Sequence, residues 1–260
     1  MPQAPILGGE YETRRKPHLE VGSDDEEEEP ETVLQKLQPS LAVGYGLGVA
    51  ISDEGQVRES DNVQGHLGIS PKPGLAFGGI LFFSDTRDLT TEDPYNLGIG
   101  GYARVRFFEA DQWTISAYSS LLYAQNQNNA TNCDQALFGN EPTNADGSCK
   151  VTWNSQALVQ LLNLNLSLLL ERKLSDRTSV ILAPGLVYDR FNSTNHEDGA
   201  VDVAMQKDHV FPSAMGFLKL TSRVATFQFG VGATRFTSFN DENARRWVYL
   251  GDATISMGLK

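Results

Sequence analysis

Residues 158–171 read LVQLLNLNLSLLLE and carry the strongest structural signal in the 260-residue chain. Leucines return at every second position from Leu162 to Leu170. The opposite face holds the polar residues Asn163, Asn165, Ser167 and Glu171. A two-residue period places the two sets on opposite faces of a β-strand, whereas in a helix the same leucines would spread around the whole circumference. The stretch therefore predicts a strand with one apolar face and one polar face, despite the helix propensity of leucine.

Nine further segments alternate in the same way between large apolar residues and small or polar ones. In the first of them, the large residues from Leu41 to Ile51 alternate with Gly44, Gly46 and Gly48. The ten expected strands cover residues 41–51, 63–69, 75–83, 95–107, 113–123, 158–171, 180–188, 213–220, 225–234 and 246–259. The sequence thus predicts an all-β fold.

The connections between the expected strands alternate between short and long. The short ones are residues 70–74, 109–112, 172–177 and 221–224. The long ones are residues 52–62, 84–94, 125–152, 189–208 and 238–244. This alternation is typical of an up-and-down antiparallel barrel with tight turns at one rim and long loops at the other. Both chain ends then lie at the rim of the short turns.

Composition excludes two classes of protein. A net charge of −12 argues against nucleic-acid binding, because phosphate neutralisation needs clustered Lys and Arg. No run approaches the roughly 18 consecutive apolar residues of a membrane-spanning helix, so helical membrane proteins are excluded as well. Membrane-spanning β-strands alternate apolar and polar residues and produce no such run, so a hydrophobic fraction of 40% is compatible with a transmembrane β-barrel. The expected fold is a barrel of this kind with about ten strands.

Residues 1–40 differ from the rest of the chain. They show no sustained apolar period, and an acidic run from Asp24 to Glu29 ends at Pro30. Self-repulsion and the lack of an apolar face predict a disordered tail that becomes ordered on a partner, or a solvated tail without a specific role. We expect two parts, the acidic tail of residues 1–40 and the barrel of residues 41–260.

From residue 41 to residue 260, the chain resembles the outer-membrane β-barrels of Gram-negative bacteria, in architecture rather than in a family motif. Aromatic residues near the expected strand ends match the interfacial girdles of that class. They are Phe83, Tyr95, Tyr123, Tyr188, Phe236, Trp247 and Tyr249 at the loop side, and Phe107, Phe108 and Trp113 at the turn side. The chain departs from the class at its last residue, because Lys260 stands where an aromatic residue is usual.

The resemblance implies a place in the bacterial outer membrane, with the short turns and the acidic tail on the periplasmic side. Acidic residues gather in the tail and the long loops, whereas the short turns and strands hold an excess of Lys and Arg. Ordinary loop solubility explains this pattern as well as a specific use does. The implied partners are outer-membrane lipid and lipopolysaccharide, with divalent cations shared at the acidic loops, and an envelope protein bound through residues 1–40.

If the apolar faces meet lipid, the opposite faces fill a narrow lumen. The charged or titratable side chains assigned to it are Arg104, Arg106, Glu171, Lys219, Asp252 and His66, with Tyr102, Tyr118 and Phe217 adding bulk. Buried charges must pair. We expect a plug in which Arg104 and Arg106 bind Glu171, and either Lys219 or Arg246 binds Asp252. The alternative is a constriction that selects small solutes by charge.

Cys133 and Cys149, the two cysteines of the chain, both fall in the longest expected loop. Their spacing lacks the paired-ligand pattern of a structural zinc site, so a disulfide in an oxidising compartment is the prediction. Two reduced thiols are the alternative.

Residues for catalysis, metal binding or cofactor binding do not emerge from the sequence. His66 has Ser116 and Ser120 as possible lumenal neighbours, but no hydrolase motif surrounds it. His196, Glu197 and Asp198 cluster in an expected loop, where a solvated loop tip is the commoner explanation. We therefore expect a protein that is not an enzyme and needs no cofactor.

These observations predict an outer-membrane barrel of structural or interaction type, with a largely plugged lumen, that docks partners through its tail and long loops. The main alternative is a narrow porin-like channel for small solutes. An outer-membrane hydrolase and a soluble barrel of lipocalin type, with its apolar face turned inward around a ligand, are less well supported.

Overall fold

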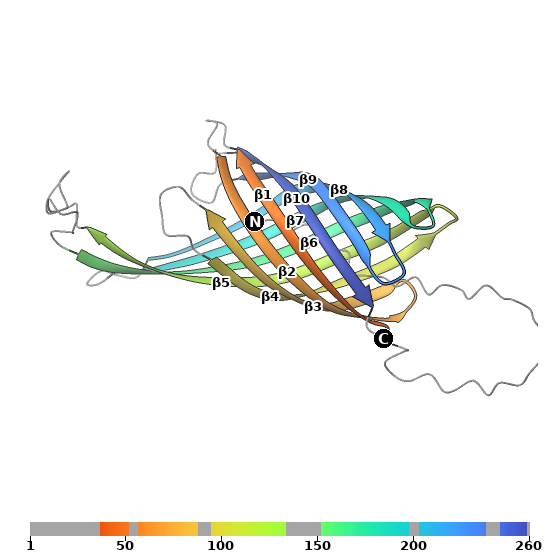
Figure 1. The fold of residues 1–260 in the computed structure, drawn as a ribbon. Coiled ribbons are helices and arrows are strands. Elements are labelled where there is room, and N and C mark those ends of the chain that lie inside the picture. The colour runs from red at the N-terminus through yellow and green to blue at the C-terminus, as the bar shows by residue number, and fades with distance from the viewer. Residues whose placement is uncertain are drawn as a thin grey trace, which may run out of the picture.

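A computed structural model describes residues 37–51, 57–87, 95–133, 152–197, 203–237 and 245–258. Ten strands in these ranges form one closed antiparallel barrel (Figure 1). They are β1 (Pro39–Ile51), β2 (Val57–Lys72), β3 (Leu75–Arg87), β4 (Tyr95–Glu109), β5 (Trp113–Cys133), β6 (Thr152–Ser175), β7 (Thr178–Glu197), β8 (Val203–Thr221), β9 (Thr226–Thr237) and β10 (Arg245–Gly258). Each strand pairs with its neighbours in sequence, so the predicted fold, strand number and up-and-down topology are confirmed.

The first and last strands close the barrel along their whole length. Their pairing runs from Ser40 opposite Gly258 to Ile51 opposite Trp247. A closed sheet leaves no free edge among its backbone groups, which a strand structure requires where lipid surrounds it. Residues 1–36 of the predicted tail lie outside the described residues, and the division into tail and barrel stays a prediction.

The barrel has two different rims. At the turn rim, on the right in Figure 1, short turns join β2 to β3, β4 to β5, β6 to β7 and β8 to β9. The first of these turns contains Gly74 with φ of 82°, a left-handed conformation that glycine adopts without steric cost. The opposite end is the loop rim, and its connections lie outside the described residues.

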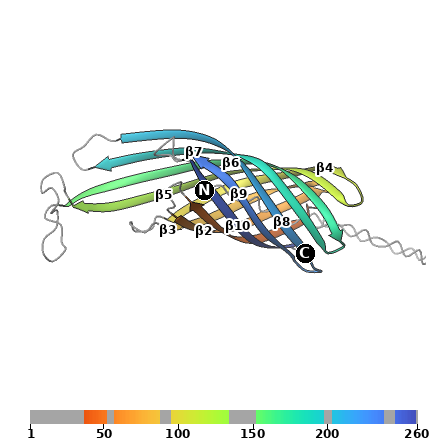
Figure 2. The ribbon, with the colours of Figure 1, turned by 90° about the horizontal axis from the view of Figure 1, so that it is seen from above.

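Several strands extend further at the loop rim than the sequence predicts, among them β2, β3 and β5 to β8. The β5–β6 pairing continues as far as Cys133 opposite Thr152, although residues 125–152 were expected to form a loop. β7 and β8 likewise pair as far as Asn195 opposite Val203, inside the expected loop of residues 189–208. The apolar alternation fades there, but backbone hydrogen bonds do not depend on it. Figure 2 shows β5 to β8 projecting beyond the other strands.

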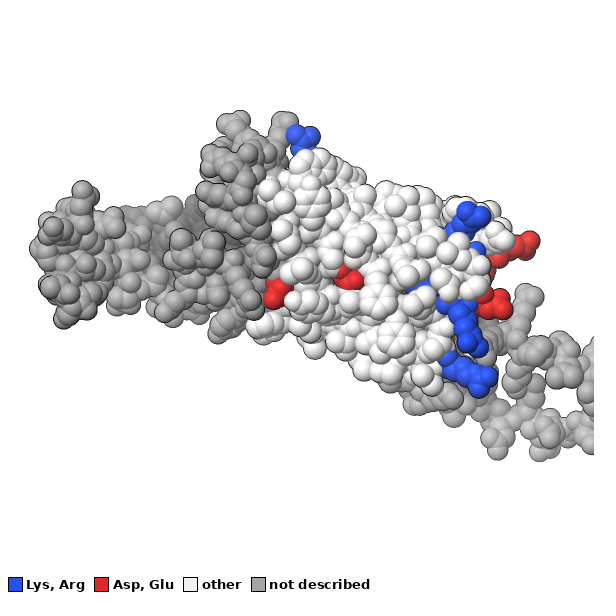
Figure 3. All heavy atoms as spheres, turned by 45° about the horizontal axis from the view of Figure 1, so that its top comes forward, with Lys and Arg blue, Asp and Glu red and all other residues white. Residues whose placement is uncertain are grey.

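The apolar faces point outward. Leu81, Leu97 and Val231 are 66%, 63% and 73% exposed, whereas the inward positions are buried and hold polar, small and some large apolar residues. A soluble barrel of lipocalin type would have the opposite arrangement, so that alternative is wrong. Figure 3 shows a broad uncharged band on one face, with Lys and Arg at the turn rim. The exposed basic residues of the turn rim include Lys72, Arg172, Arg177 and Arg223.

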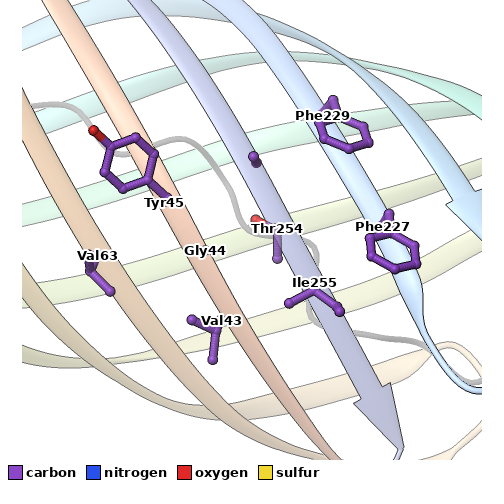
Figure 4. A pocket seen from close by; sticks show the side chains of 9 residues that line it. Val43, Gly44, Tyr45, Val63, Phe227, Phe229, Thr254 and Ile255 are labelled. Carbon is purple, nitrogen blue, oxygen red and sulfur yellow. The ribbon is translucent and has the colours of Figure 1, made fainter.

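The outer wall is uneven within this apolar band. Ala253 of β10 lies between Tyr45 of β1 and Phe229 of β9 in the sheet register. The small side chain between two aromatic ones leaves a shallow apolar groove (Figure 4), which is part of the outward face. Among the described residues there is no helix with the length and apolar character needed to cross a membrane.

Candidate functional site in the barrel lumen

Glu171 is the centre of a buried charge network near the turn rim. Its Oε1 accepts hydrogen bonds from Lys219 Nζ at 2.9 Å and from Ser179 Oγ at 2.6 Å. Its Oε2 lies 3.6 Å from the Arg104 guanidinium, which also donates to Ser116 Oγ at 3.4 Å. Glu171 and Arg104 are 4% and 3% exposed. The structure thus brings three of the six predicted lumen residues together.

The strand register explains why these side chains meet. Arg104 comes from β4 and Glu171 from β6, and the small Ser116 is the inward residue of β5 between the two positions that lie opposite them. The guanidinium can therefore cross β5. Lys219 of β8 lies directly opposite Ser179 of β7 and reaches past it to Glu171.

Arg106 does not follow the predicted pairing with Glu171. Its guanidinium lies 3.1 Å from Glu109 on the same strand, at the turn rim. The β4–β5 register shifts between Arg106 and Phe108, and the amide of Arg106 donates to the carbonyl of Gly74 at 2.6 Å. This irregular strand end holds Arg106 beside the turn rather than in the network.

Asp252 and His66 lie in the lumen outside this network. Lys219 binds Glu171 rather than Asp252, and the side chain of Arg246 lies outside the described residues. Asp252 Oδ1 accepts a hydrogen bond from Thr254 Oγ1 at 3.0 Å. His66 Nε2 is 3.3 Å from Gln64 Oε1. The six predicted residues therefore form one network and three separate sites, at Arg106, Asp252 and His66.

A second buried polar contact was missed by the sequence analysis. Asn163 of β6 lies opposite Asp189 of β7, and its amide donates to the Asp189 carboxylate. Both side chains are buried. The sequence predicts Asp189 at the start of a loop. Its position two residues after the inward Val187 was the signal that the alternation continues.

Apolar side chains fill much of the lumen between its buried polar groups. Thirteen buried apolar or aromatic residues form one cluster, of which only Tyr102, Tyr118 and Phe217 were predicted. The rings of Tyr102 and Tyr118 stack with centroids 6.3 Å apart. Interior glycines make room for large neighbours: a Cβ at Gly68 would collide with the Tyr102 hydroxyl, and one at Gly230 with the Phe217 ring. Sequence alternation cannot reveal this packing, because a lumen face can hold either polar or apolar residues.

Several predicted features fall outside the described residues. Cys133 ends β5, but its side chain and the whole of Cys149 are not described, so the disulfide stays a prediction. The side chains of His196 and Glu197 and all of Asp198 are not described either, and the absence of enzymatic activity stays a prediction. In the described part of the chain, no group of three His, Cys, Asp or Glu side chains could hold a metal ion.

One tryptophan near each rim lies beside an arginine side chain. The Arg172 guanidinium lies 5.5 Å from the centre of the Trp113 ring at the turn rim. At the loop rim, the Arg235 guanidinium lies 6.0 Å from the centre of the Trp247 ring. An outward apolar band between rims of aromatic and basic residues is the surface of a protein that spans a bilayer.

Comparison with solved structures gives the same fold. The translocator domain of the autotransporter NalP from Neisseria meningitidis matches with a TM-score of 0.52 and 11% identity, over 88% of this chain and 90% of that one. This is the fold of a bacterial outer-membrane β-barrel. No family model matches the sequence, and no curated protein matches it significantly.

Two further outer-membrane barrels were matched, both from Escherichia coli. The outer-membrane protease OmpT matches with a TM-score of 0.43 and 7% identity, over 89% of this chain and 99% of that one. The transport unit of the autotransporter AIDA-I matches with a TM-score of 0.41 and 9% identity, over 91% and 93%. The match to the NalP translocator domain confirms the predicted resemblance to outer-membrane barrels at the level of the class, and the outward apolar band of this barrel lies in the outer membrane.

Proposed function

We propose that this outer-membrane barrel is closed to solutes and serves as a structural or docking protein of the cell envelope. The observation that carries the proposal is the burial of the lumen from rim to rim. Ser256 near the turn rim is 3% exposed and Val248 near the loop rim is 4% exposed. The wall residues of an open aqueous pore would be accessible. Barrels of about eight strands have interiors that side chains fill, and open channels are typical at about 16 strands.

A conductance measurement tests the closed lumen. The purified barrel in a planar bilayer should show no steady ion current. Arg104→Ala combined with Lys219→Ala removes the two cations that reach Glu171 over the neighbouring strands β5 and β7, and this variant should conduct. A matched double variant at the rim, Arg172→Ala with Arg177→Ala, removes the same charge from exposed positions and should stay silent. A steady, charge-selective current through the unmodified protein would support the channel instead.

The projecting part of β5 to β8 supports a docking role. Beyond Gln125, no described strand pairs with the outer edge of β5, because the β4–β5 pairing stops there. In the same way, β8 pairs with β9 only from Ser213 onward, so residues 203–212 form a second free edge within the described strands. A free edge can accept an extended peptide as an additional strand.

The two free edges differ in chemistry. The β8 edge contains Lys207, Asp208 and Pro212, which are the residue types that block unwanted strand pairing. Residues 126–132 of β5 read NQNNATN and contain neither a charged residue nor proline. We therefore assign the docking role to the β5 edge, with an extended, uncharged polar segment of an envelope or surface protein as its partner. The acidic tail of residues 1–40 is the proposed second contact, on the periplasmic side.

Photo-crosslinking in intact cells tests the docking edge. A photoreactive residue placed at Gln127 should give a discrete crosslinked product, and one placed at Lys207 on the other edge should not. Adding Asn128→Pro should abolish the product, because proline removes a backbone donor. Heat-modifiable migration on a gel confirms that each variant is folded. Equal products from both edges, or a product that survives Asn128→Pro, would contradict strand addition at β5.

A further inference from the structure

Exposed basic side chains gather at the turn rim (Figure 3). They are Lys72 at the end of β2, Arg172 on β6, and Arg177 and Arg223 in the turns that follow β6 and β8. The exposed acidic side chains of the described turn rim are Glu109, Asp111 and Asp176. Glu109 already forms an ion pair with Arg106 at 3.1 Å. Because only two carboxylates then stand against four exposed cations, the rim keeps an excess of positive charge.

The chain enters the barrel at the same rim. Ser40 of β1 lies opposite Gly258 there, and the three preceding residues, 37–39, are each half-buried. Gln38 has a φ of 43°, a left-handed conformation that is uncommon for residues other than glycine. The chain therefore bends where β1 begins, and the end of the preceding segment lies close to the rim.

The densest negative charge of the sequence lies a short distance before this bend. Six consecutive acidic residues, Asp24 to Glu29, end ten residues before Pro39. Ten extended residues span about 33 Å. A closed barrel of ten strands, spaced about 4.8 Å apart and tilted by about 40°, is about 20 Å wide. The acidic run can therefore reach every turn of the rim.

We propose that the acidic run Asp24–Glu29 binds the exposed basic residues of its own turn rim. Opposite charges attract the two, and the short connection keeps the run at a millimolar effective concentration. Because individual exposed ion pairs are weak in water, the connection makes the contact possible rather than any single pair. An envelope protein that docks on the tail must displace the run from the rim. That consequence rests on the proposed function, whereas the contact itself does not.

The phosphate groups of anionic lipids are the other chemistry that fits these basic side chains. Arg172 lies beside the Trp113 ring on the outer wall, where a lipid headgroup can reach it. Arg177 and Arg223 instead lie in turns beyond the last paired residues of β6 and β8. Their position past the wall favours the connected acidic run over lipid.

Photo-crosslinking of the purified full-length protein tests the contact. A photoreactive residue is placed at position 27, and the barrel is inserted into vesicles of zwitterionic phosphatidylcholine. We expect a crosslink from position 27 to a turn-rim peptide of the same chain, identified by mass spectrometry of the monomer band. The product should be lost at about 1 M NaCl, where the Debye length falls to about 3 Å.

Charge exchange separates a specific contact from chance proximity. Arg177→Glu combined with Arg223→Glu should abolish the product, and replacing the other five acidic residues of the run with lysine should then restore it. The matched pair Arg190→Glu with Arg235→Glu, exchanged at the loop rim, should leave the product unchanged. Heat-modifiable migration on a gel confirms that each variant is folded.

Three outcomes would overturn the proposal. They are a product that survives charge reversal at the turn rim, a crosslink formed only between two chains, and a product lost when phosphatidylglycerol is added to the vesicles. The last result would assign the rim to lipid phosphate. None of them bears on docking at the β5 edge, which is measured in cells from Gln127.

Discussion

Replacing Glu171 with glutamine should destabilise the barrel by about 3 kcal/mol, the cost of breaking a buried ion pair by removing one partner. Glutamine keeps the size of the side chain and can still accept the hydrogen bond from Ser179. It leaves the charges of Arg104 and Lys219 buried without their carboxylate. Urea unfolding of the barrel in lipid vesicles, followed by tryptophan fluorescence, measures the loss.

The lost stability should be regained when the unpaired charges of Arg104 and Lys219 are removed as well. Glu171→Leu combined with Arg104→Leu and Lys219→Met replaces the whole network with apolar residues of similar volume, and such replacements are often neutral or stabilising. Asp208→Asn breaks the exposed pair with Arg190 and should leave the unfolding curve nearly unchanged, because water screens exposed pairs. A Glu171→Gln barrel as stable as the unmodified protein would show that the network does not hold the lumen together.

Gly78→Ala should be the most damaging small substitution in the sheet, with a loss of about 3 kcal/mol. A Cβ at Gly78 would lie 2.6 Å from the Cα of Gly68 on β2, and closer still to the carbonyl oxygen of Leu67. Both are backbone atoms, so no rotamer change can relieve the contact. β2 and β3 would have to separate locally and lose hydrogen bonds. The fraction of protein that folds into vesicles and the urea midpoint measure the effect.

The next residue provides a matched control. Gly79 points outward, and the nearest atom to a Cβ there is the carbonyl oxygen of Gly100 at 3.9 Å. Gly79→Ala should stabilise the barrel by about 0.5 kcal/mol, since glycine within a strand costs conformational entropy. If both variants unfolded at the same urea concentration, the close approach of β2 and β3 at Gly78 would be refuted.

The sequence predicted the strands well because each wall residue faces either lipid or lumen. That choice repeats every two residues, and the alternation at Leu162 to Leu170 records it directly. The predicted strands were too short where the contrast between apolar and polar positions ends, as in residues 126–133 of β5. Backbone pairing continues there without an apolar face, and a pattern of side chains cannot report it.

The partner of each charged side chain in the lumen was harder to predict than the face of the sheet on which that side chain lies. Alternation correctly turned Arg104, Glu171 and Lys219 inward, but it could not assign Lys219 to Glu171 rather than to Asp252. That assignment depends on the stagger of β7 and β8, which places Lys219 opposite Ser179. The irregular end of β4 removed Arg106 from the network in the same way.

The residue pattern within each segment thus determined the number of strands, the face of the sheet on which each side chain lies, and the difference between the two rims. The reason is that a two-residue period and the length of a connection are properties of neighbouring residues. Closure of β1 on β10 and the apolar packing in the lumen arose only in three dimensions. They depend on the register between strands distant in the chain. Register is set by the summed packing and hydrogen bonding of the whole barrel, and no single segment of the sequence contains it.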